Sequence, residues 1–230
     1  MNIAERIARR AYDLAVRAGL APYRRQWLLS PSDWDASYAS GSLDFYGALS
    51  EQGRYGVLVG LIRAFSGKAR ILDVGCGVGV LRARIPDEDV EIYVGIDPSK
   101  VAIAKAEAQA FSKSRFEVAE RPAPEAGTFD LIVLNEMMYY VEDLDGLMIA
   151  LKSHLAPGGW LLTSMFQHAG DVALHRTVAR HFTEIDVLEV VRRNYKPLHA
   201  WRVACYGLGE TDTSGLRERP LERGLRLEGE

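Results

Sequence analysis

The chain has 230 residues, of which 48% are hydrophobic and 26% charged, and its formal net charge at neutral pH is −3. This composition is ordinary for a globular protein with one α/β domain and an appended segment, and a chain of this length buries a sizeable core without disulfides or metals. The acidic balance argues against nucleic acid as a substrate, because phosphate binding generally needs a basic face.

The cysteine content and the N-terminus bear on the compartment. The two cysteines, Cys76 and Cys205, stand in separate apolar contexts without metal-ligand spacing, which indicates a reduced, intracellular protein with no metal site. No apolar run approaches the ~18 residues of a membrane span. Six arginines within the first 25 residues fit a transit peptide or a membrane-surface helix, but a solvated helix face explains them more simply. We therefore expect a cytoplasmic protein with no membrane partner.

The first segment, 1–67, is predicted to form a helical lid. Apolar residues recur at helical spacing from Asn2 to Ala18 and again from Gln52 to Phe65. Between these two helices, the stretch from Tyr23 to Gly47 is rich in aromatic residues and shows no periodicity, so we expect it to be irregular. A solvated linker would not carry so much aromatic surface, so this stretch is expected to pack over another part of the molecule.

From residue 68 to residue 208 the pattern alternates between strand and helix, which predicts a parallel sheet with helices on both faces, a three-layer sandwich. Strands are expected at 69–74, 91–96, 115–119, 129–134 and 159–166, and helices near 79–85, 99–111, 143–155 and 169–182. Two further extended runs, Ile185 to Val191 and Trp201 to Tyr206, predict an antiparallel hairpin at the end, giving seven strands. The remaining tail, 209–230, is polar and lacks periodicity.

The most informative stretch is ILDVGCGVGVL, residues 71–81. A buried strand runs into alternating glycines from Gly75 to Gly79, which permit a sharp turn and close approach of a ligand. We expect a helix beyond the turn, whose N-terminus would offer free N–H groups. A dinucleotide fingerprint would need glycine where Val80 stands. Asp73, just before the turn, would repel a pyrophosphate but not a ligand that carries an ammonium group.

A second carboxylate, Asp97, ends the next predicted strand, where ligands bind in open α/β sheets and where it can accept both hydroxyls of a ribose. Together these features resemble class I S-adenosylmethionine (SAM) methyltransferases, whose first motif is acidic-x-G-x-G-x-G. The resemblance covers 68–208 and implies a Rossmann-like seven-stranded sheet that binds SAM and releases S-adenosylhomocysteine (SAH). It also implies that Asp97 holds the ribose and that Glu120, after the third strand, reaches the adenine amino group. The predicted cofactor-binding residues are Asp73, Gly75, Cys76, Gly77, Gly79, Asp97, Pro98, Glu120, Asn135, Arg54 and Tyr46.

Three residues of the lid segment are candidate ligands for the methionine part of SAM. Arg54, on the helix before the first strand, can clamp a carboxylate with its guanidinium if it faces the glycine turn. Tyr46 and Tyr38 can close over the cofactor, because aromatic faces attract a sulfonium cation. The alternative for Arg54 is a position on the helix surface.

The fourth strand and its exit read FDLIVLNEMMYY, residues 129–140, so Asn135 and Glu136 would lie beside the methyl group. Nucleic-acid amino-methyltransferases of this fold carry N/D-P-P-Y/F here, so the sequence Asn-Glu-Met-Met also argues against a nucleic-acid substrate. The Tyr139-Tyr140 pair and a W-D-x-x-Y-x-x-G…R-Y pattern resemble small-molecule methyltransferases similar to the nodulation N-methyltransferases, which act on chitooligosaccharide. The residues of that pattern are Trp34, Tyr38, Gly41, Arg54 and Tyr55.

Methyl transfer is a displacement at an activated carbon, so the protein mainly aligns donor and acceptor and excludes water. A hydroxyl or ammonium acceptor must also lose a proton, for which a base is useful. His168, after the fifth strand, and Glu136 are the candidate bases, and Tyr140 completes the predicted catalytic set. The alternative for His168 is a surface position at the start of a helix.

These features predict a SAM-dependent methyltransferase that acts on a hydroxyl, amine or carboxylate of a small molecule, such as a sugar or a natural-product intermediate, as a monomer or homodimer. Two other classes remain open. One is a non-catalytic SAM-binding regulatory protein, because no single residue is a decisive catalyst. The other is a nicotinamide-dependent oxidoreductase, which the spacing of the glycines disfavours.

Overall fold

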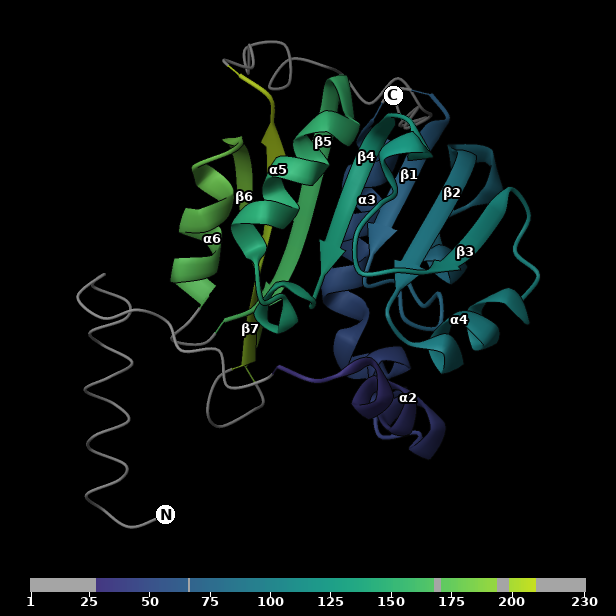
Figure 1. The fold of residues 1–230 in the computed structure, drawn as a ribbon. Helices are drawn as coiled ribbons and strands as arrows, with labels where there is room; N and C mark the ends of the chain where they lie inside the picture. Colours follow the sequence, from purple (N-terminus) through teal and green to yellow (C-terminus); the bar gives the residue numbers. More distant parts are fainter. Residues whose placement is uncertain (1–27, 66, 168–170, 194–198, 210–230) are drawn as a thin grey trace, which may run out of the picture.

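The computed structural model describes residues 28–65, 67–167, 171–193 and 199–209, which form three layers around one sheet (Figure 1). The predicted helix from Asn2 to Ala18, the candidate base His168 and the tail from residue 210 lie outside the described residues. The strands are β1 Ala69–Val74, β2 Val90–Asp97, β3 Ser114–Val118, β4 Phe129–Asn135, β5 Leu155–Phe166, β6 Thr183–Arg192 and β7 His199–Gly207. The α-helices with described residues are α2 Pro31–Ser40, α3 Gln52–Ala64, α4 Lys100–Glu107, α5 Leu144–His154 and α6 Asp171–Ala179.

The sheet has seven strands in the order β3-β2-β1-β4-β5-β7-β6. Strands β1 to β5 run parallel, and β7 is antiparallel to both of its neighbours, β5 and β6. The predicted class, a seven-stranded and mostly parallel sheet with an antiparallel C-terminal hairpin, is therefore confirmed. Because parallel strands end at the same edge, the carboxyl ends of β1, β2 and β4 lie side by side, above α2 in Figure 1.

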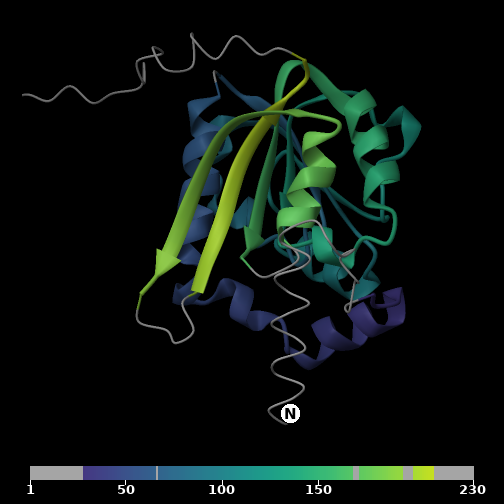
Figure 2. The ribbon, with the colours of Figure 1, turned by 90° about the vertical axis from the view of Figure 1, so that its left-hand side faces the viewer.

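Helix α3 covers one face of the sheet, and α5 and α6 cover the other (Figures 1 and 2). On the first face, Leu58 and Ile62 of α3 pack with Ile71 of β1, and all three are almost completely buried. On the second face, Leu147 and Leu151 of α5 pack into a separate cluster. Full burial of such side chains stabilises the fold by about 1.5–3 kcal/mol each. The two clusters fix the sheet edge on which the functional site is built.

Two parts of the predicted secondary structure are wrong. The helix expected at 79–85 is a series of turns with a single 3₁₀ turn, Arg82–Arg84. Gly79 has a φ of +80°, outside the helical region, and Ile85, the residue before Pro86, is extended, so too few residues remain between them for a regular helix. The aromatic stretch expected to be irregular contains α2, which starts at a Ser30 capping box and ends at Gly41 in the left-handed conformation.

The boundary between α5 and β5 also differs from the prediction. The helix was expected to reach 155 and the strand to begin at 159, whereas α5 ends at His154 and β5 begins at Leu155, so the strand includes Pro157, Gly158 and Gly159. The register against β4 jumps from Leu155 to Trp160, so the glycines form an irregularity within the strand. In the part of the chain that the structure describes, no helix combines the length and apolarity required to cross a bilayer.

Candidate functional site

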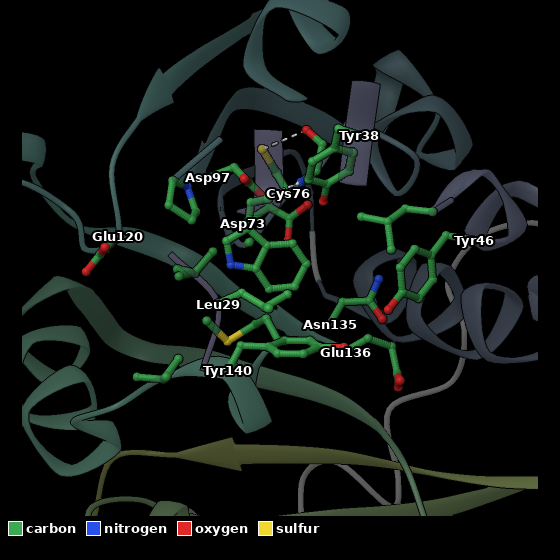
Figure 3. A pocket seen from close by; sticks show the side chains of 18 of the residues that line it. Leu29, Tyr38, Tyr46, Asp73, Cys76, Asp97, Glu120, Asn135, Glu136 and Tyr140 are labelled. Atoms are coloured by element: carbon green, nitrogen blue, oxygen red, sulfur yellow. Dashed lines mark hydrogen bonds between the residues drawn. The ribbon is translucent and has the colours of Figure 1, made fainter. Parts of the chain in front are cut away.

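A cavity of about 570 Å³ opens where the carboxyl ends of β1, β2 and β4 meet α2 and α3 (Figure 3). Its volume lies within the range of about 300–1,000 Å³ that small-molecule sites occupy. We call it the main cavity. The residues of the predicted site that line it are Tyr46, Arg54, Asp73, Gly75, Cys76, Gly77, Asp97, Pro98, Glu120, Asn135, Glu136 and Tyr140.

Gly79 is the member of the predicted set, among the described residues, that does not line the main cavity. It has a φ of +80°, and a Cβ there would come within 3.0 Å of the Phe111 ring. The glycine therefore suits the turn and its close packing against Phe111, and its contact with the cofactor stays a prediction.

The glycine turn brings backbone to the floor of the cavity. Gly75 and Gly77 have φ angles of +74° and +55°, and a Cβ on Gly77 would lie 2.8 Å from the Tyr38 hydroxyl. The expected free helix N-terminus is absent from this described turn. Instead, the Gly75 N–H donates to the Ile96 carbonyl (2.8 Å) and the Gly77 N–H to Asp97 (3.0 Å). The turn is thus fastened to the end of β2.

Asp97 is held by backbone donors on both sides of its carboxylate. One oxygen accepts from the Gly77 N–H, and the other accepts from the Ser99 N–H at 2.9 Å. Burial raises the pKa of Asp97 to about 6, and these two hydrogen bonds oppose that rise by stabilising the charged form. The carboxylate is therefore fixed in orientation at the cavity wall, with further lone pairs that can accept a ligand's hydroxyls.

Asp73, at the end of β1, is almost fully buried beside Asp97. One of its oxygens accepts a hydrogen bond from the Tyr93 hydroxyl. The other, Oδ1, has no hydrogen-bond partner among the described residues, although it is buried. Burial raises the pKa of Asp73 to about 7, and the Asp97 charge adds to the rise. A buried acceptor without a donor calls for a ligand donor, such as an ammonium group.

Arg54 turns inward from α3 and is 1% exposed, so it is not a surface arginine. Its Nε pairs with Glu51 at 2.8 Å, and its Nη1 donates to Asn135. Its Nη2 is buried and unpaired within the described part of the chain. Because Arg54 also lines the main cavity, this donor is available to an anionic group of a ligand.

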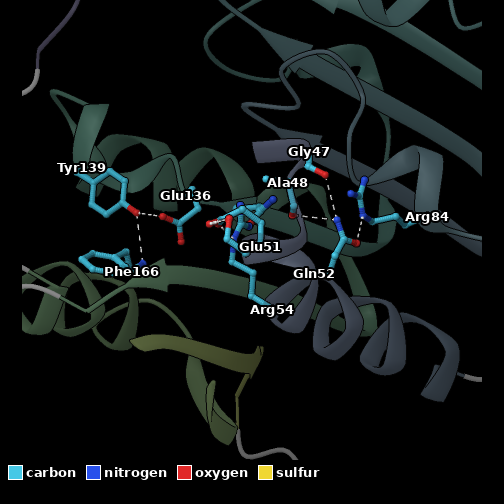
Figure 4. Close-up of polar contacts among 11 residues, drawn as sticks. Gly47, Ala48, Glu51, Gln52, Arg54, Arg84, Glu136, Tyr139 and Phe166 are labelled. Atoms are coloured by element: carbon cyan, nitrogen blue, oxygen red, sulfur yellow. Dashed lines mark hydrogen bonds and ion pairs between the residues drawn. The ribbon is translucent and has the colours of Figure 1, made fainter. Parts of the chain in front are cut away.

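Glu136 follows β4 in a left-handed conformation, with φ at +59°. Such a conformation is uncommon for a residue with a side chain and is concentrated at functional sites. Its N–H donates to the Ser164 carbonyl at 2.7 Å, and its Oε2 accepts from the Tyr139 hydroxyl (Figure 4). Burial raises the pKa of Glu136 to about 7, against the opposing effects of Arg54 and Tyr139. A carboxyl that titrates near neutral pH can accept a proton under working conditions.

Helix α2 roofs the main cavity. Trp34 packs edge-on against Tyr140 with ring centroids 4.7 Å apart. Asp35 accepts from the Ser99 hydroxyl (2.6 Å) and from the Val101 N–H (3.2 Å), which ties α2 to the start of α4. The roof is therefore anchored next to Asp97.

Glu120 and Tyr46 lie on opposite sides of the main cavity (Figure 3). Glu120 is exposed, as the short loop after β3 leaves it in solvent. Tyr46 is half-buried, and its ring lies 5.7 Å from the Arg54 guanidinium carbon. Glu120 stays the predicted contact of the adenine, and Tyr46 stays the predicted contact of the sulfonium.

Sequence reasoning missed three residues that position the predicted ones: Tyr93, Glu51 and Asp35. The signals were weak. Tyr93 is a polar interruption of an apolar strand, and Glu51 stands three residues before Arg54, where helical pairs meet. Asp35 was part of the W-D pattern, but its partner Ser99 lies 64 residues away along the chain.

Sequence comparison supports one family. The profile of a family described as a methyltransferase domain matches residues 49–207. The chain is 32% identical over 121 residues to the trans-aconitate 2-methyltransferase of Deinococcus radiodurans, and the match covers 51% of this chain and 46% of that relative. The chain thus spans less than half the length of that protein. It is 28% identical over 165 residues to the ubiquinone biosynthesis O-methyltransferase of Chromobacterium violaceum, covering 67% of this chain and 70% of the relative.

Structural comparison shows the same fold. The N-methyltransferase NodS of Bradyrhizobium japonicum, solved with SAH, superposes with a TM-score of 0.64 at 18% identity, covering 77% of this chain and 99% of NodS. The [4+2]-cyclase SpnF superposes with a TM-score of 0.64 at 16% identity, covering 80% of this chain and 99% of SpnF. At these identities the superpositions bear on the fold alone.

Proposed function

This chain belongs to the class I SAM-dependent methyltransferases, and on that premise we propose that it transfers the methyl group of SAM to a small-molecule acceptor. The observation that carries the proposal is a pair of buried, unpaired groups of opposite charge. Asp73 Oδ1 and Arg54 Nη2 both belong to residues that line the main cavity, and neither has a partner among the residues described. An amino acid moiety, with one ammonium and one carboxylate, complements such a pair.

The residues present fit the remainder of SAM as well. Asp97, oriented by the Gly77 and Ser99 N–H groups, would hold the ribose hydroxyls. The positive φ angles at Gly75 and Gly77 leave no side chain between the turn and the cavity. Glu120 would meet the adenine at the exposed end, and Tyr46, beside Arg54, would face the sulfonium.

When bound, SAM supplies a methyl group on a positively charged sulfur, which keeps the electron pair of the breaking C–S bond. The chain's own residues then have two tasks. Trp34 and Tyr140 close the roof over the cavity and exclude water. Glu136 takes the proton of the acceptor, with His168 as the other candidate base. Tyr139 holds the Glu136 carboxylate in place.

The acceptor is proposed to be a hydroxyl, amine or carboxylate of a small molecule. The names of two relatives, a ubiquinone biosynthesis O-methyltransferase and a trans-aconitate 2-methyltransferase, support small-molecule acceptors rather than nucleic acid. The absence of the N/D-P-P-Y/F pattern after β4 supports the same conclusion, because Asn135 is followed by Glu136 and Met137.

Two measurements test the proposal. In the first, the melting temperature of the full chain is followed during titration with SAH and, separately, with NADH. A ligand at about 100 times its Kd stabilises the folded state by about 2.7 kcal/mol. We expect SAH to raise the melting temperature and NADH to leave it unchanged. A rise with NADH alone would contradict SAM binding and would indicate a nicotinamide-dependent enzyme.

In the second measurement, the protein is mixed with SAM and fractions of a small-molecule extract, and SAH release is recorded by mass spectrometry. We expect Glu136→Ala or His168→Ala to slow release while SAH affinity stays nearly unchanged. The superposition with a protein described as a cyclase makes this assay necessary, since the fold alone does not dictate methyl transfer. SAH binding without any release in all fractions would favour a non-catalytic role.

A further inference from the structure

A second pocket, of about 400 Å³, adjoins the main cavity. We call it the aromatic pocket, because most of its wall is formed by ring side chains from four separate segments of the chain. It shares Tyr46, Glu136 and Tyr140 with the main cavity, so the two spaces meet at these residues. The rings that line it are Phe45, Tyr46, Tyr139, Tyr140, Phe166, His199 and Trp201.

The rings of the aromatic pocket form pairs at the separations typical of aromatic contacts. Phe166 and Trp201 lie 5.6 Å apart and nearly perpendicular, and Tyr139 and Tyr140 lie 5.1 Å apart and also nearly perpendicular. Trp201 and Tyr139 are buried, so their orientation is fixed by packing. A wall of fixed edges and faces gains most from a flat ring, which can stack on some members and meet others edge-on.

The polar groups of the aromatic pocket are mostly engaged. The Tyr139 hydroxyl is bonded to Glu136 and accepts from the Phe166 N–H at 3.3 Å (Figure 4). Glu51 is paired with Arg54, and Arg192 and His199 have interactions of their own. A polyhydroxylated sugar would need many partners in such a pocket, because each buried hydroxyl without one is costly.

Oε1 of Glu136 differs from these groups, because it is a buried oxygen with no hydrogen-bond partner within the described ranges. Glu136 stands where the two spaces meet, and its left-handed backbone fixes the direction of its side chain. An unpaired carboxylate oxygen calls for one donor from the ligand. One hydroxyl on an otherwise apolar ring satisfies it.

Resting on the methyl transfer proposed above, we propose that the aromatic pocket is the acceptor subsite and that it takes a flat aromatic ring bearing a hydroxyl, with that hydroxyl directed at Glu136. In the reaction the hydroxyl oxygen forms a bond to the methyl carbon as the C–S bond breaks. The electron pair of that bond stays on sulfur, and the hydroxyl proton passes to the ionised Glu136. Atoms and charge balance without a further reactant.

Calorimetric titration of the full chain, saturated with SAH, tests this subsite with two matched probes. The first is 2-naphthol, and the second is trans-decahydro-2-naphthol, which has the same hydroxyl on a saturated, puckered skeleton. We expect 2-naphthol to bind at least tenfold more tightly. Ser50 lines the aromatic pocket but not the main cavity. We expect Ser50→Phe to fill the pocket and abolish 2-naphthol binding while SAH affinity stays within about twofold.

Two exposed neighbours provide a graded variant and its control. Phe45 lines the aromatic pocket, whereas Leu49 is 89% exposed and does not. We expect Phe45→Ala to weaken 2-naphthol binding about three- to tenfold, and Leu49→Ala to leave it unchanged. Equal affinity for the saturated probe, or undiminished binding in Ser50→Phe, would overturn the subsite. Failure of SAH itself to bind would instead overturn the proposed function, so the two failures are distinct.

Discussion

The main cavity and the aromatic pocket are built in different ways. The Gly77–Asp97 end of the main cavity is built from backbone and short-range contacts of two adjacent strands, and Gly77 and Asp97 are joined across a single crossover. The aromatic pocket gathers side chains from segments as distant as Phe45 and Trp201. A site made from backbone at a strand edge is tied to the fold itself, whereas a site made from distant side chains can change without altering it. The comparison explains why one fold serves many acceptors.

The largest expected effect is on the pH dependence of stability and comes from Asp73, whose buried carboxyl lines the main cavity. Its pKa is about 7 in the folded state against a usual value of 3.8. Between these values the folded state binds more protons than the unfolded state, so the free energy of unfolding falls as pH rises, by about 1.4 kcal/mol per pH unit. We expect Asp73→Asn, which cannot ionise, to remove the contribution of Asp73 to this slope and to leave those of Asp97 and Glu136, whose pKa values are also raised. Urea unfolding at several pH values from 4 to 8 measures it, and parallel curves for the two proteins would contradict it.

A smaller loss is expected in SAH binding when Asp97 is replaced by alanine. Two hydrogen bonds to a charged group contribute about 3 kcal/mol together, so affinity should fall at least about 100-fold. Glu91 is exposed near the other end of β2, and Glu91→Ala is the matched control. Calorimetry on both variants decides the matter. A loss of similar size in the control would mean that damage to the strand, rather than loss of a ligand contact, weakens binding.

Two tyrosine–carboxylate pairs test whether the aromatic pocket and the Asp73 side of the main cavity are independent of each other. Tyr139 donates to Glu136, and Tyr93 donates to Asp73, and each hydroxyl stabilises the ionised partner. We expect Tyr139→Phe to raise the pKa of Glu136 by about one unit and to leave Asp73 unaffected. Tyr93→Phe should do the opposite. Carbon-13 NMR of the side-chain carboxyls measures the pKa of each group separately. A changed pKa at both carboxyls in either variant would show that the two sites are coupled.

The smallest effect is expected from Asp35, which ties the roof to α4. Asp35→Ala removes the acceptor for Ser99 and Val101, so SAH affinity should fall about three- to tenfold, equivalent to about 1 kcal/mol. Asp44→Ala, at an exposed position of the same segment, is the control. Unchanged affinity in the Asp35 variant would mean that the roof is held by its aromatic contacts alone.

The same contrast governs what could be predicted from the sequence. The sheet, its hairpin and the cavity position of Asp73 and Asp97 follow from hydrophobic periodicity and from glycines at the end of a strand, all of which are local signals. The helix expected after β1 is missing because Gly79 is left-handed and Pro86 follows closely, and the conformation of Gly79 is set by the turn rather than by a sequence period. The inward position of Arg54 and the placement of Phe45 and Trp201 around one pocket depend on tertiary packing, which no short window of sequence contains.

The roof helix α2 also has a kinetic consequence. In its ten residues, all of them described, no side chain is fully buried, so little apolar area holds it down. Segments of this kind open at a small fraction of the free energy of global unfolding. The entry of SAM and the exit of SAH would therefore be limited by the lifting of α2 and not by any movement of the sheet. Amide hydrogens of α2 should exchange rapidly in the free protein and slow down when SAH is present, while those of β1 and β4 stay protected throughout.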